Sequence, residues 1–382
     1  MNTQQETSNQ QPETPLRVAL VLNTSWNIWN FRAGLVRALQ AAGHEVLAIA
    51  PPDDYSARLG PELGCRYVPI LMENKGTNPL QDAALTRRFY QIYRRERPDV
   101  ILHYTIKPNI YGTLAARLAG IPCINNVSGL GTVFIVQNLV SKVALGLYRL
   151  AFRFPRKVFF QNDDDRQLFI SNGLVRPEIT GLLPGSGVDT AKFRPAPAFV
   201  RNAPFVFLMV ARVLYEKGIV EYFEAARLVR EAVPGTRIQL LGGLDEAGGV
   251  GVPRAVFEQW LTAGNIEYLG RADDVATYLH RADAVVLPSY REGTPKTLLE
   301  AAACGKPLIT TDVPGCRETV PADGRNGYRC QVRSADDLAA KMLAMLALND
   351  EALAAMGRAS RHLAETVFDE RRVLAAYLEA VG

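Results

Sequence analysis

Two glutamates eight positions apart, Glu292 and Glu300, lie within the stretch SYREGTPKTLLEAAACGKPLITTD, residues 289–312. The apolar run before them predicts a buried strand, and the residues after it predict a helix with Thr294 as N-cap and Pro295 as first helical residue. Amides at a helix start attract anions such as a diphosphate, and carboxylates accept hydrogen bonds from sugar hydroxyls. The pair is therefore typical of a nucleotide-sugar site, although either glutamate alone equally fits a solvated surface charge.

Two more loops that follow apolar runs carry groups suited to a diphosphate. Arg212 and Lys217 lie in MVARVLYEKG, where an arginine can bind phosphate with two hydrogen bonds and a lysine adds a point charge. The loop LGGLDEAGGVGVP, at 241–253, contains five glycines, Gly243 among them, which permit a ligand to approach the backbone closely. The alternatives are a solvated surface pair for the two cations and an ordinary flexible loop for the glycines.

The first half of the chain offers candidate acceptor-binding groups in three segments: TSWNIWNFR (24–32), HYTIKPNIYG (103–112) and NNVSGLGT (125–132). The candidate residues are Arg32, His103, Lys107, Asn109 and Gly129. A histidine at the end of a strand is more often a hydrogen-bonded core residue than a ligand-binding one. The aromatic residues of 24–32 fit either a core or the wall of a binding site, so both alternatives stay open.

The elements that must position these loops alternate between apolar strands and helical patterns, and the alternation restarts after the Pro/Ala-rich passage at 193–204. This predicts an α/β fold of two Rossmann-like, doubly wound domains that face each other across a cleft. Ligands of such sheets bind at the carboxyl ends of strands, where the candidate loops lie. The predicted parts are a disordered tail at 1–14, a first domain at 15–195 and a second domain at 196–365. Two final helices, predicted at 336–348 and 352–382, fall outside the alternation.

Length and composition narrow the class of protein. A chain of 382 residues with 48% hydrophobic residues is long for one core and favours two domains. Its five scattered cysteines form no C-x-x-C pair, which fits a reducing cytosol and argues against a disulfide framework or a zinc ribbon. No His/Cys set has metal-ligand spacing. Asp163, Asp164 and Asp165 contain a D-x-D pattern, which we interpret as a capping cluster at a helix start.

One part of the chain is strongly cationic. Between Val100 and Asn162 there is no Asp or Glu, whereas seven residues are Lys or Arg. The segment 133–157 combines these cations with apolar residues at helical spacing, which suits a helix lying on an anionic membrane surface. A core helix with a basic outer face is the alternative. The segment contains no run of about 18 apolar residues that would span a membrane.

The pattern from Glu292 to Glu300 resembles the E-x7-E element of the retaining family 4 glycosyltransferases, which have a GT-B fold. Three further segments resemble landmarks of that family: ARVLYEKG, PGSGVDTAKFRP and DVPGCRETV. Within the family, FRAGLVRAL, TIKPNIYG and VSGLGTVFI resemble the subgroup that extends polyprenyl-diphosphate-linked glycans. The resemblance implies that the final helix, 366–382, crosses back to pack on the first domain.

The resemblance also implies roles for the residues. Arg212 and Lys217 would neutralise the donor diphosphate, Glu300 would hold the ribose and Glu292 the transferred sugar, so that Arg212, Lys217 and Glu292 form the catalytic set. The implied donor-binding residues are Gly243, Gly293, Thr294, Pro295, Lys296 and Glu300.

The activity implied is a retaining hexosyltransferase that requires no metal or other cofactor. It would move an N-acetylhexosamine such as GalNAc from a UDP-sugar to a polyprenyl-diphosphate-linked saccharide in bacterial surface glycan assembly. The expected location is cytoplasmic, on the inner face of the plasma membrane, where the Lys142–Lys157 region meets anionic lipid; no nucleic acid is expected as a partner.

Two other functions stay open. One is a nucleotide-sugar enzyme of GT-B fold that uses a soluble acceptor or epimerises its substrate, which would turn over a UDP-sugar without lipid. The other is a non-catalytic protein that senses nucleotide-sugars, which would bind them without releasing UDP.

Overall fold

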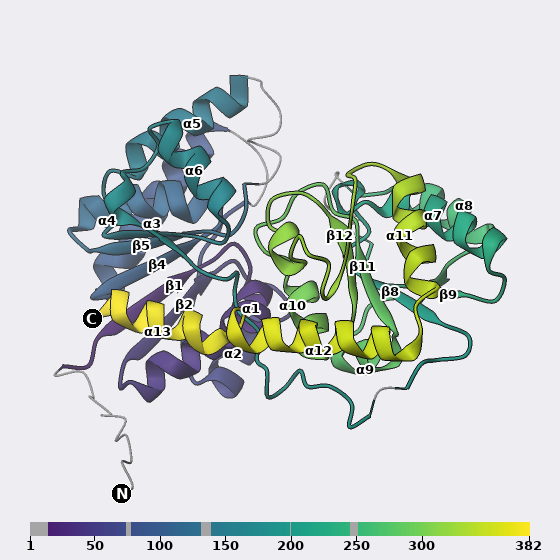
Figure 1. Cartoon of the computed structure of the whole chain (residues 1–382). Helices are drawn as coiled ribbons and strands as arrows, with labels where there is room; N and C mark the ends of the chain where they lie inside the picture. Colours follow the sequence, from purple (N-terminus) through teal and green to yellow (C-terminus); the bar gives the residue numbers. More distant parts are fainter. Residues whose placement is uncertain (1–13, 74–77, 131–138, 199, 245–250) are drawn as a thin grey trace, which may run out of the picture.

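The computed structural model of the chain describes residues 14–73, 78–130, 139–198, 200–244 and 251–382. Within them, two α/β domains lie side by side, each built on a parallel sheet (Figure 1). The first sheet has the strand order β3-β2-β1-β4-β5-β6-β7, and the second has the order β10-β9-β8-β11-β12-β13. In each sheet the strand order therefore changes direction at the first strand of the domain, β1 or β8, as it does in a doubly wound sheet. The predicted fold class is confirmed.

The N-terminal domain alternates strands and helices from its first strand onward. Its strands are β1 Arg17–Val21, β2 Glu45–Ala50, β3 Arg66–Pro69, β4 Val100–Tyr104, β5 Cys123–Val127, β6 Lys157–Phe160 and β7 Thr180–Leu182. Its helices are α1 Ser25–Ala41, α2 Ser56–Leu63, α3 Pro79–Glu96, α4 Thr113–Ala119, α5 Leu139–Ala151 and α6 Asp163–Ser171, with a π-helical turn at Pro108–Gly112 before α4. The central strands are buried on both faces because helices cover the sheet on both sides, which explains their continuous apolar runs.

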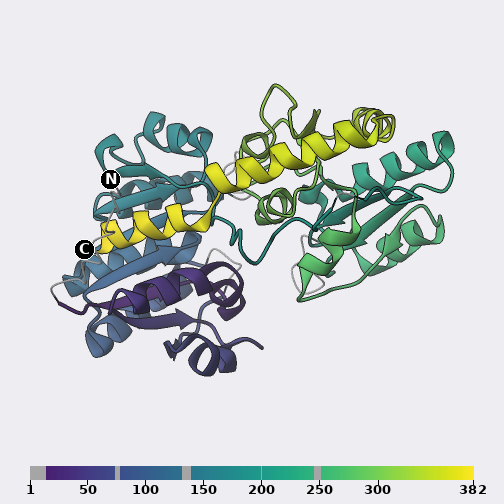
Figure 2. The ribbon, with the colours of Figure 1, turned by 60° about the horizontal axis from the view of Figure 1, so that its bottom comes forward.

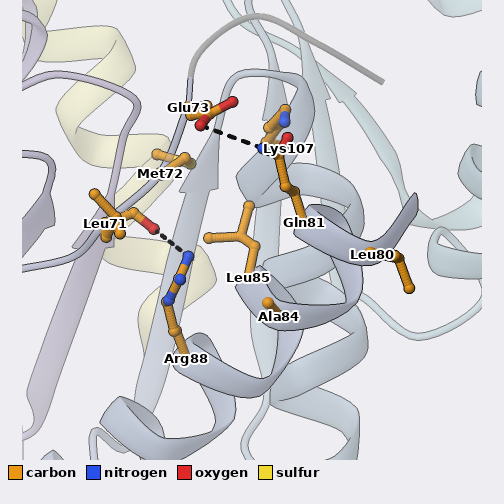
Figure 3. Close-up of a pocket in the computed structure, with 9 residues that line it drawn as sticks. All are labelled: Leu71, Met72, Glu73, Leu80, Gln81, Ala84, Leu85, Arg88 and Lys107. Atoms are coloured by element: carbon orange, nitrogen blue, oxygen red, sulfur yellow. Dashed lines mark hydrogen bonds between the residues drawn. The ribbon is translucent and has the colours of Figure 1, made fainter. Parts of the chain in front are cut away.

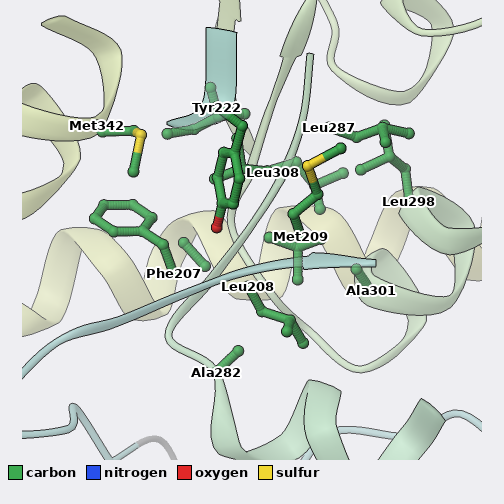
Figure 4. Close-up of a cluster of buried hydrophobic side chains, with 14 of the residues drawn as sticks. Phe207, Leu208, Met209, Tyr222, Ala282, Leu287, Leu298, Ala301, Leu308 and Met342 are labelled. Atoms are coloured by element: carbon green, nitrogen blue, oxygen red, sulfur yellow. The ribbon is translucent and has the colours of Figure 1, made fainter. Parts of the chain in front are cut away.

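The C-terminal domain repeats this plan. Its strands are β8 Val206–Val210, β9 Arg237–Leu241, β10 Glu267–Tyr268, β11 Ala284–Leu287, β12 Leu308–Thr311 and β13 Gly327–Cys330. Its helices are α7 Ile219–Ala232, α8 Arg254–Thr262, α9 Val275–Arg281, α10 Lys296–Ala303 and α11 Ala335–Leu346. Figure 4 shows how side chains from β8 meet Tyr222 of α7, Leu298 of α10 and Met342 of α11 in one hydrophobic cluster.

Two predictions about the final helices are corrected. α11 follows strand β13, which the sequence reading missed, and it packs against α7, so it belongs to the alternation. The predicted helix at 352–382 is two helices, α12 Asp350–Thr366 and α13 Glu370–Val381. The residues between α12 and α13 are hydrogen-bonded to Val188, which lies between β7 and β8. Val188 N donates to Phe368 O at 2.8 Å, and Glu370 N donates to Val188 O at 3.0 Å.

After this break the chain changes domain. α12 runs along the C-terminal domain, and α13 lies on the N-terminal domain, as Figures 1 and 2 show from two directions. Val373, Tyr377 and Val381 of α13 are buried in the same cluster as β1 and β4. The predicted crossing of the last helix to the first domain is therefore confirmed.

The start of α1 is also earlier than expected. Helical spacing in the sequence predicts a helix from Phe31, whereas α1 already begins at Ser25. Thr24 is its N-cap, since the Thr24 hydroxyl accepts a hydrogen bond from Asn27 N at 3.0 Å. Arg32, inside the predicted helix, is also helical in the structure.

Candidate functional site

The candidate site of the C-terminal domain lies where two loops leave neighbouring strands. β8 and β11 pair in parallel, while β9 lies on the far side of β8 and β12 on the far side of β11. The loops that follow β8 and β11 therefore diverge to opposite faces of the sheet, and the space between them is the usual ligand position in doubly wound folds. These loops carry Arg212 and Lys217 after β8, and Glu292 after β11.

Lys217 and Glu292 are brought together as an ion pair. The Lys217 ammonium donates to the Glu292 carboxylate, and the Ser289 hydroxyl donates to the same carboxylate oxygen at 2.7 Å. The two side chains keep 19% and 14% of their exposed area, so the pair is largely withdrawn from water but still reachable. A cation that is held this way is suited to exchange its carboxylate partner for an incoming phosphate.

Gly218 holds the two loops together. Its backbone is left-handed, with φ at +72°, and a Cβ added there would lie 2.1 Å from the carbonyl oxygen of Pro288. A side chain at 218 would therefore push the β8 loop away from the β11 loop. The close packing of these two loops is what places Lys217 against Glu292.

Glu300 lies further along α10 and is mostly buried. Lys296 Nζ is 3.8 Å from its carboxylate. Burial raises the pKa of Glu300, and the positive charge of Lys296 opposes this shift. The carboxylate therefore gains from any hydrogen-bond donor, such as a ribose hydroxyl, that enters beside it.

Lys296, in the C-terminal domain, also contacts the N-terminal domain. Its ammonium donates to the carbonyl oxygen of Asn30 on α1 and stands 4.8 Å from the centroid of the Phe31 ring. Burial lowers the pKa of Lys296, and the nearby charge of Arg32 lowers it further, while Glu300 raises it. The start of α10 thus meets the first turns of α1.

The predicted cap of α10 is corrected. The helix begins at Lys296, Pro295 is the residue before it, and no side chain caps it. Thr294 instead donates its hydroxyl to the carbonyl oxygen of Gln161 in the N-terminal domain, at 2.9 Å. The observed N-cap is thus one residue later than predicted, because the Thr294 hydroxyl is hydrogen-bonded to the other domain.

Gly243 lies beside the β8 loop. Val213 N donates to Gly243 O at 3.0 Å, and a Cβ on the neighbouring Gly242 would lie 1.7 Å from the carbonyl oxygen of Ala211. Arg212, whose side chain is exposed, follows Ala211 directly. Most of the remaining predicted glycine loop, 245–250, lies outside the described residues.

The comparisons with known proteins agree with this geometry. Residues 28–185 match a family model described as "Glycosyl transferase 4-like domain", and residues 192–363 match "Glycosyl transferases group 1". The chain is 31% identical, over 88% of its own length and 91% of the relative's, to the N,N'-diacetylbacillosaminyl-diphospho-undecaprenol alpha-1,3-N-acetylgalactosaminyltransferase of Campylobacter jejuni. The chain belongs to the group 1 glycosyl transferases.

Two further similarities place this glycosyltransferase among its relatives. It is 27% identical, over 65% of its length and 66% of the relative's, to the UDP-Gal:alpha-D-GlcNAc-diphosphoundecaprenol alpha-1,3-galactosyltransferase of Escherichia coli. Its fold is similar to that of Anabaena Alr3699/HepE, solved in complex with UDP and glucose. That similarity has a TM-score of 0.79 over 96% of this chain and 99% of the other, at 19% identity.

The acceptor-side candidates of the glycosyltransferase are less exposed than the sequence suggested. His103 is fully buried, and its ring contacts the hydroxyl of Tyr93 at 2.9 Å and the amide oxygen of Asn125 at 3.1 Å. Burial lowers the pKa of His103 to about 3, so the ring is neutral. Both ring nitrogens have partners in the core, which fits the alternative of a hydrogen-bonded core histidine; an acceptor-binding role for His103 stays a prediction.

Asn109 and Arg32 are also buried. Asn109 donates to Asn126 O at 2.8 Å. The Arg32 guanidinium stacks 4.3 Å from the centroid of the Tyr104 ring, and its Nε has no hydrogen-bond partner within the described part of the chain. Of the two, Arg32 stays a candidate for an anionic substrate group, because it lies near Lys296 at the junction of the domains.

Lys107 lines a cavity of about 270 Å³ at the ends of β3 and β4 (Figure 3). Its ammonium is paired with Asp82 at 2.9 Å, and Asp82 also accepts a hydrogen bond from Tyr111 at 2.7 Å. The cavity wall is largely apolar, with Leu71 and Leu80 exposed at its edge. This cavity does not include the ion pair at the β8 and β11 loops.

Gly129 is the acceptor-side candidate in direct contact with the donor side. A Cβ at Gly129 would lie 3.2 Å from Gly293 N, and one at Gly293 would lie 2.0 Å from the carbonyl oxygen of Ser128. The backbones of the two domains touch here. The pair of glycines therefore lets the loop after β5 close on the loop after β11.

The acidic cluster begins a helix as predicted. Asp163, Asp164 and Asp165 form the first turn of α6, and the cap is Asn162, whose side-chain oxygen accepts from Asp165 N at 2.8 Å. Within the described residues, no group of His, Cys, Asp or Glu is arranged to hold a metal ion. All five cysteines are buried and unpaired. Among the helices that the structure describes, none is long and apolar enough to cross a membrane.

The sequence reading missed the residues that join the domains at the site, Asn162, Asp165 and Arg291. Arg291 lies directly before Glu292 and is not among the predicted site residues. No local pattern pairs it with Asp165, which is 126 positions away in the chain. The hydroxyl of Ser289, which supports Glu292, was likewise missed, although its place three residues before the glutamate was a usable signal.

Proposed function

We propose that this glycosyltransferase moves an N-acetylhexosamine such as GalNAc from a UDP-sugar to a polyprenyl-diphosphate-linked saccharide, with retention of anomeric configuration. The observation that carries the donor half of the proposal is the Lys217–Glu292 ion pair between the β8 and β11 loops, with Glu300 buried on the following helix. The acceptor half is supported by the Campylobacter jejuni and Escherichia coli relatives, whose names both specify diphosphate-linked undecaprenol.

The proposed roles follow from charge and position. Arg212 and Lys217 neutralise the charge that develops on the leaving diphosphate, and the uncapped amides at the start of α10 add hydrogen bonds to it. Glu300 accepts hydrogen bonds from the ribose hydroxyls. Glu292, released from Lys217 when phosphate binds, accepts hydrogen bonds from the transferred sugar.

Retention is proposed to arise from attack on the same face that the diphosphate leaves. The departing phosphate oxygen takes the proton of the acceptor hydroxyl, so that the C–O bond to the acceptor forms as the C–O bond to the diphosphate breaks. His103 cannot serve as a base here, because it is buried and hydrogen-bonded in the core. Product configuration by NMR tests this proposal, and an inverted product contradicts it.

Metal independence is a separate proposal. Fixed cations at Arg212 and Lys217 supply the positive charge that a divalent ion supplies in other transferases. Enzyme treated with EDTA is therefore expected to keep full turnover. Loss of activity on chelation, with recovery on adding Mg²⁺ or Mn²⁺, would refute this proposal.

We also propose that the enzyme works on the cytoplasmic face of the plasma membrane and attaches through the region Lys142–Lys157. In this region Lys142, Arg149, Arg153 and Arg156 are exposed, and so are Val143, Leu150 and Phe154. Exposed cations beside exposed apolar groups suit the interface of an anionic bilayer, at about 1 kcal/mol for each cation near the surface. The rest of the predicted segment, 133–138, lies outside the described residues.

Membrane attachment is tested by changing Arg149, Arg153 and Arg156 together to Glu. We expect sedimentation with vesicles that contain phosphatidylglycerol to fall strongly, while turnover of a short water-soluble acceptor stays near that of the wild type. Unchanged sedimentation would remove the attachment proposal and leave the transfer proposal standing.

The experiment that tests the function is a panel of UDP-, GDP- and dTDP-sugars, each incubated with and without membrane lipid extract, with nucleotide release as the readout. We expect release of UDP that depends on the lipid extract. Turnover without lipid would favour a soluble acceptor or an epimerase. Binding of a UDP-sugar without UDP release would favour a sensor.

A further inference from the structure

The loop that carries Glu292 is held by the other domain on both sides of this residue. Arg291, before it, donates to the carboxylate of Asp165 on α6. Gly293, after it, accepts a hydrogen bond at 2.8 Å from the side-chain amide of Asn162, the cap of α6. The next residue, Thr294, donates to Gln161 O at 2.9 Å. Three residues around Glu292 are thus held by the segment 161–165.

The acidic partner of this ion pair is buried, whereas Arg291 is partly exposed. The side chain of Asp165 keeps 1% of its exposed area, and burial raises the pKa of this carboxyl while the charge of Arg291 opposes the shift. Asn162 also donates to Asp165 at 3.2 Å, so both carboxylate oxygens have partners. A desolvated pair of this kind holds its two loops firmly while both charges are present, and fails when one is removed.

We propose that Asp165 and Arg291 form a positioning latch, which places Glu292 for the transferred sugar when the two domains close. Asp165 and Arg291 act through Glu292 and need not touch the substrate. This inference rests on the proposed role of Glu292 in the donor site. It adds that the acceptor domain, and not the donor domain alone, determines how that carboxylate is oriented.

The structure provides a matched control. Asp164, the neighbour of Asp165, faces Arg317 of the C-terminal domain at 3.6 Å; the Asp164 side chain is exposed and the Arg317 side chain is partly exposed. Exposed pairs contribute little to the stability of a contact. Asp164→Asn therefore removes the same charge from the same helical turn and the same domain interface without touching the residues beside Glu292.

The test compares Asp165→Asn and Arg291→Gln with Asp164→Asn. We expect the two latch variants to lower kcat at least about tenfold, with the Kd for UDP within about twofold of the wild type, since Arg212, Lys217 and Glu300 remain in place. Asp165→Glu, which keeps the charge, is expected to recover part of kcat. Asp164→Asn is expected to behave as the wild type.

Two measurements keep this test independent of the transfer assay. Calorimetry with UDP and with UDP-GalNAc is expected to show that the latch variants lose the affinity difference between the two ligands. Small-angle scattering is expected to give a larger radius of gyration for both latch variants than for wild type or Asp164→Asn. If the wild-type enzyme bound neither ligand, the proposed function would be refuted. The latch would then be tested only by the radius of gyration from scattering. An unchanged radius of gyration, or a kcat within about twofold of wild type, would overturn the latch.

Discussion

Beyond the carboxyl ends of β8 and β11, charged side chains meet as a partly exposed ion pair, whereas polar side chains on β4 and β5 are buried against one another. Lys217 and Glu292 stay reachable from the solvent. His103 and Asn125 are fully buried and hydrogen-bonded within the N-terminal domain. The two sheets share a strand order, so the position of a polar residue at a strand end does not by itself identify a ligand-binding group; its exposure and its partners do.

The cores of the two domains differ as well. In the C-terminal domain one cluster joins the sheet to the helices on both of its faces. In the N-terminal domain the described residues form separate clusters, and the one around β1 and β2 contains Val373, Tyr377 and Val381 from α13. The core of the N-terminal domain therefore includes a helix that follows the whole C-terminal domain in the chain, whereas among the described residues the core cluster of the C-terminal domain contains none from α1 to α6.

The largest expected effect tests this dependence. Tyr377→Ala removes a fully buried ring whose centroid lies 5.1 Å from that of Phe159 and 6.0 Å from that of Tyr104. We expect it to lower the free energy of unfolding by about 3–5 kcal/mol, because a large cavity replaces the ring. Urea unfolding followed by fluorescence measures the change.

Tyr377→Phe is the control for that prediction, since it keeps the ring and removes the hydrogen bond from Asn126 at 2.9 Å. It is expected to cost about 1 kcal/mol. UDP affinity at low temperature is expected to stay unchanged in both variants, because the proposed donor site lies in the other domain. Equal loss of stability in Ala and Phe variants would show that packing of α13 is not what matters.

The next largest effect concerns the donor loops. Lys217→Ala is expected to lower kcat by about 10²–10³-fold, because a fixed charge aimed at the leaving diphosphate is lost, with a smaller effect on stability. Steady-state kinetics and thermal unfolding measure the two quantities. Lys341→Ala, at an exposed lysine paired within α11, is the control and should leave kcat unchanged. A decrease below about threefold for Lys217→Ala would place the diphosphate elsewhere.

The smallest effect concerns the buried histidine. Burial lowers the pKa of His103 to about 3, below the ordinary value of 6.5. Between about pH 6.5 and pH 3, His103 is therefore protonated in the unfolded chain and neutral in the folded chain. The free energy of unfolding accordingly decreases as the pH falls below about 6.5. Between pH 7 and pH 5 this residue alone is expected to cost on the order of 2 kcal/mol.

His103→Gln is expected to flatten that part of the stability curve, which urea unfolding at several pH values would show. If both proteins lost the same stability between pH 7 and pH 5, His103 would be protonated in the folded state. In charge, His103 would then be similar to Lys217 and Glu292 in the loops of the C-terminal domain, and not to the uncharged core residues of its own domain.

Much of the fold was predictable because it follows from short sequence patterns, namely helical spacing and apolar runs. The helix α7, Ile219–Ala232, and the central strands belong to the predicted alternation of helical patterns and apolar runs. The short strands β3 and β13 were missed, since four residues with mixed polarity carry little signal. The break between α12 and α13 was also missed, because it depends on Val188, which meets Phe368 and Glu370 across the chain.

Of the candidate site, the meeting of the loops after β8 and β11 was predictable, because both loops follow buried strands of one sheet; the donor-binding role of their residues stays a prediction. Gly218 and Gly293 could be recognised as positions of close approach, although not what approaches them. The burial of His103 could not be decided from its neighbours in sequence, because the Tyr93 and Asn125 side chains reach it from two other elements.

By itself, the sequence determined two doubly wound domains, the loops that carry Arg212, Lys217 and Glu292, and the family to which these loops belong. Buried strands, glycine turns and charged loops are properties of short segments, so they can be read along the chain. The tertiary structure alone decided that Asp165 meets Arg291, that Thr294 serves the domain interface instead of a helix cap, and that His103 is enclosed by Tyr93 and Asn125. Those contacts join residues far apart in the chain, and they exist because of how the two packed domains sit against each other.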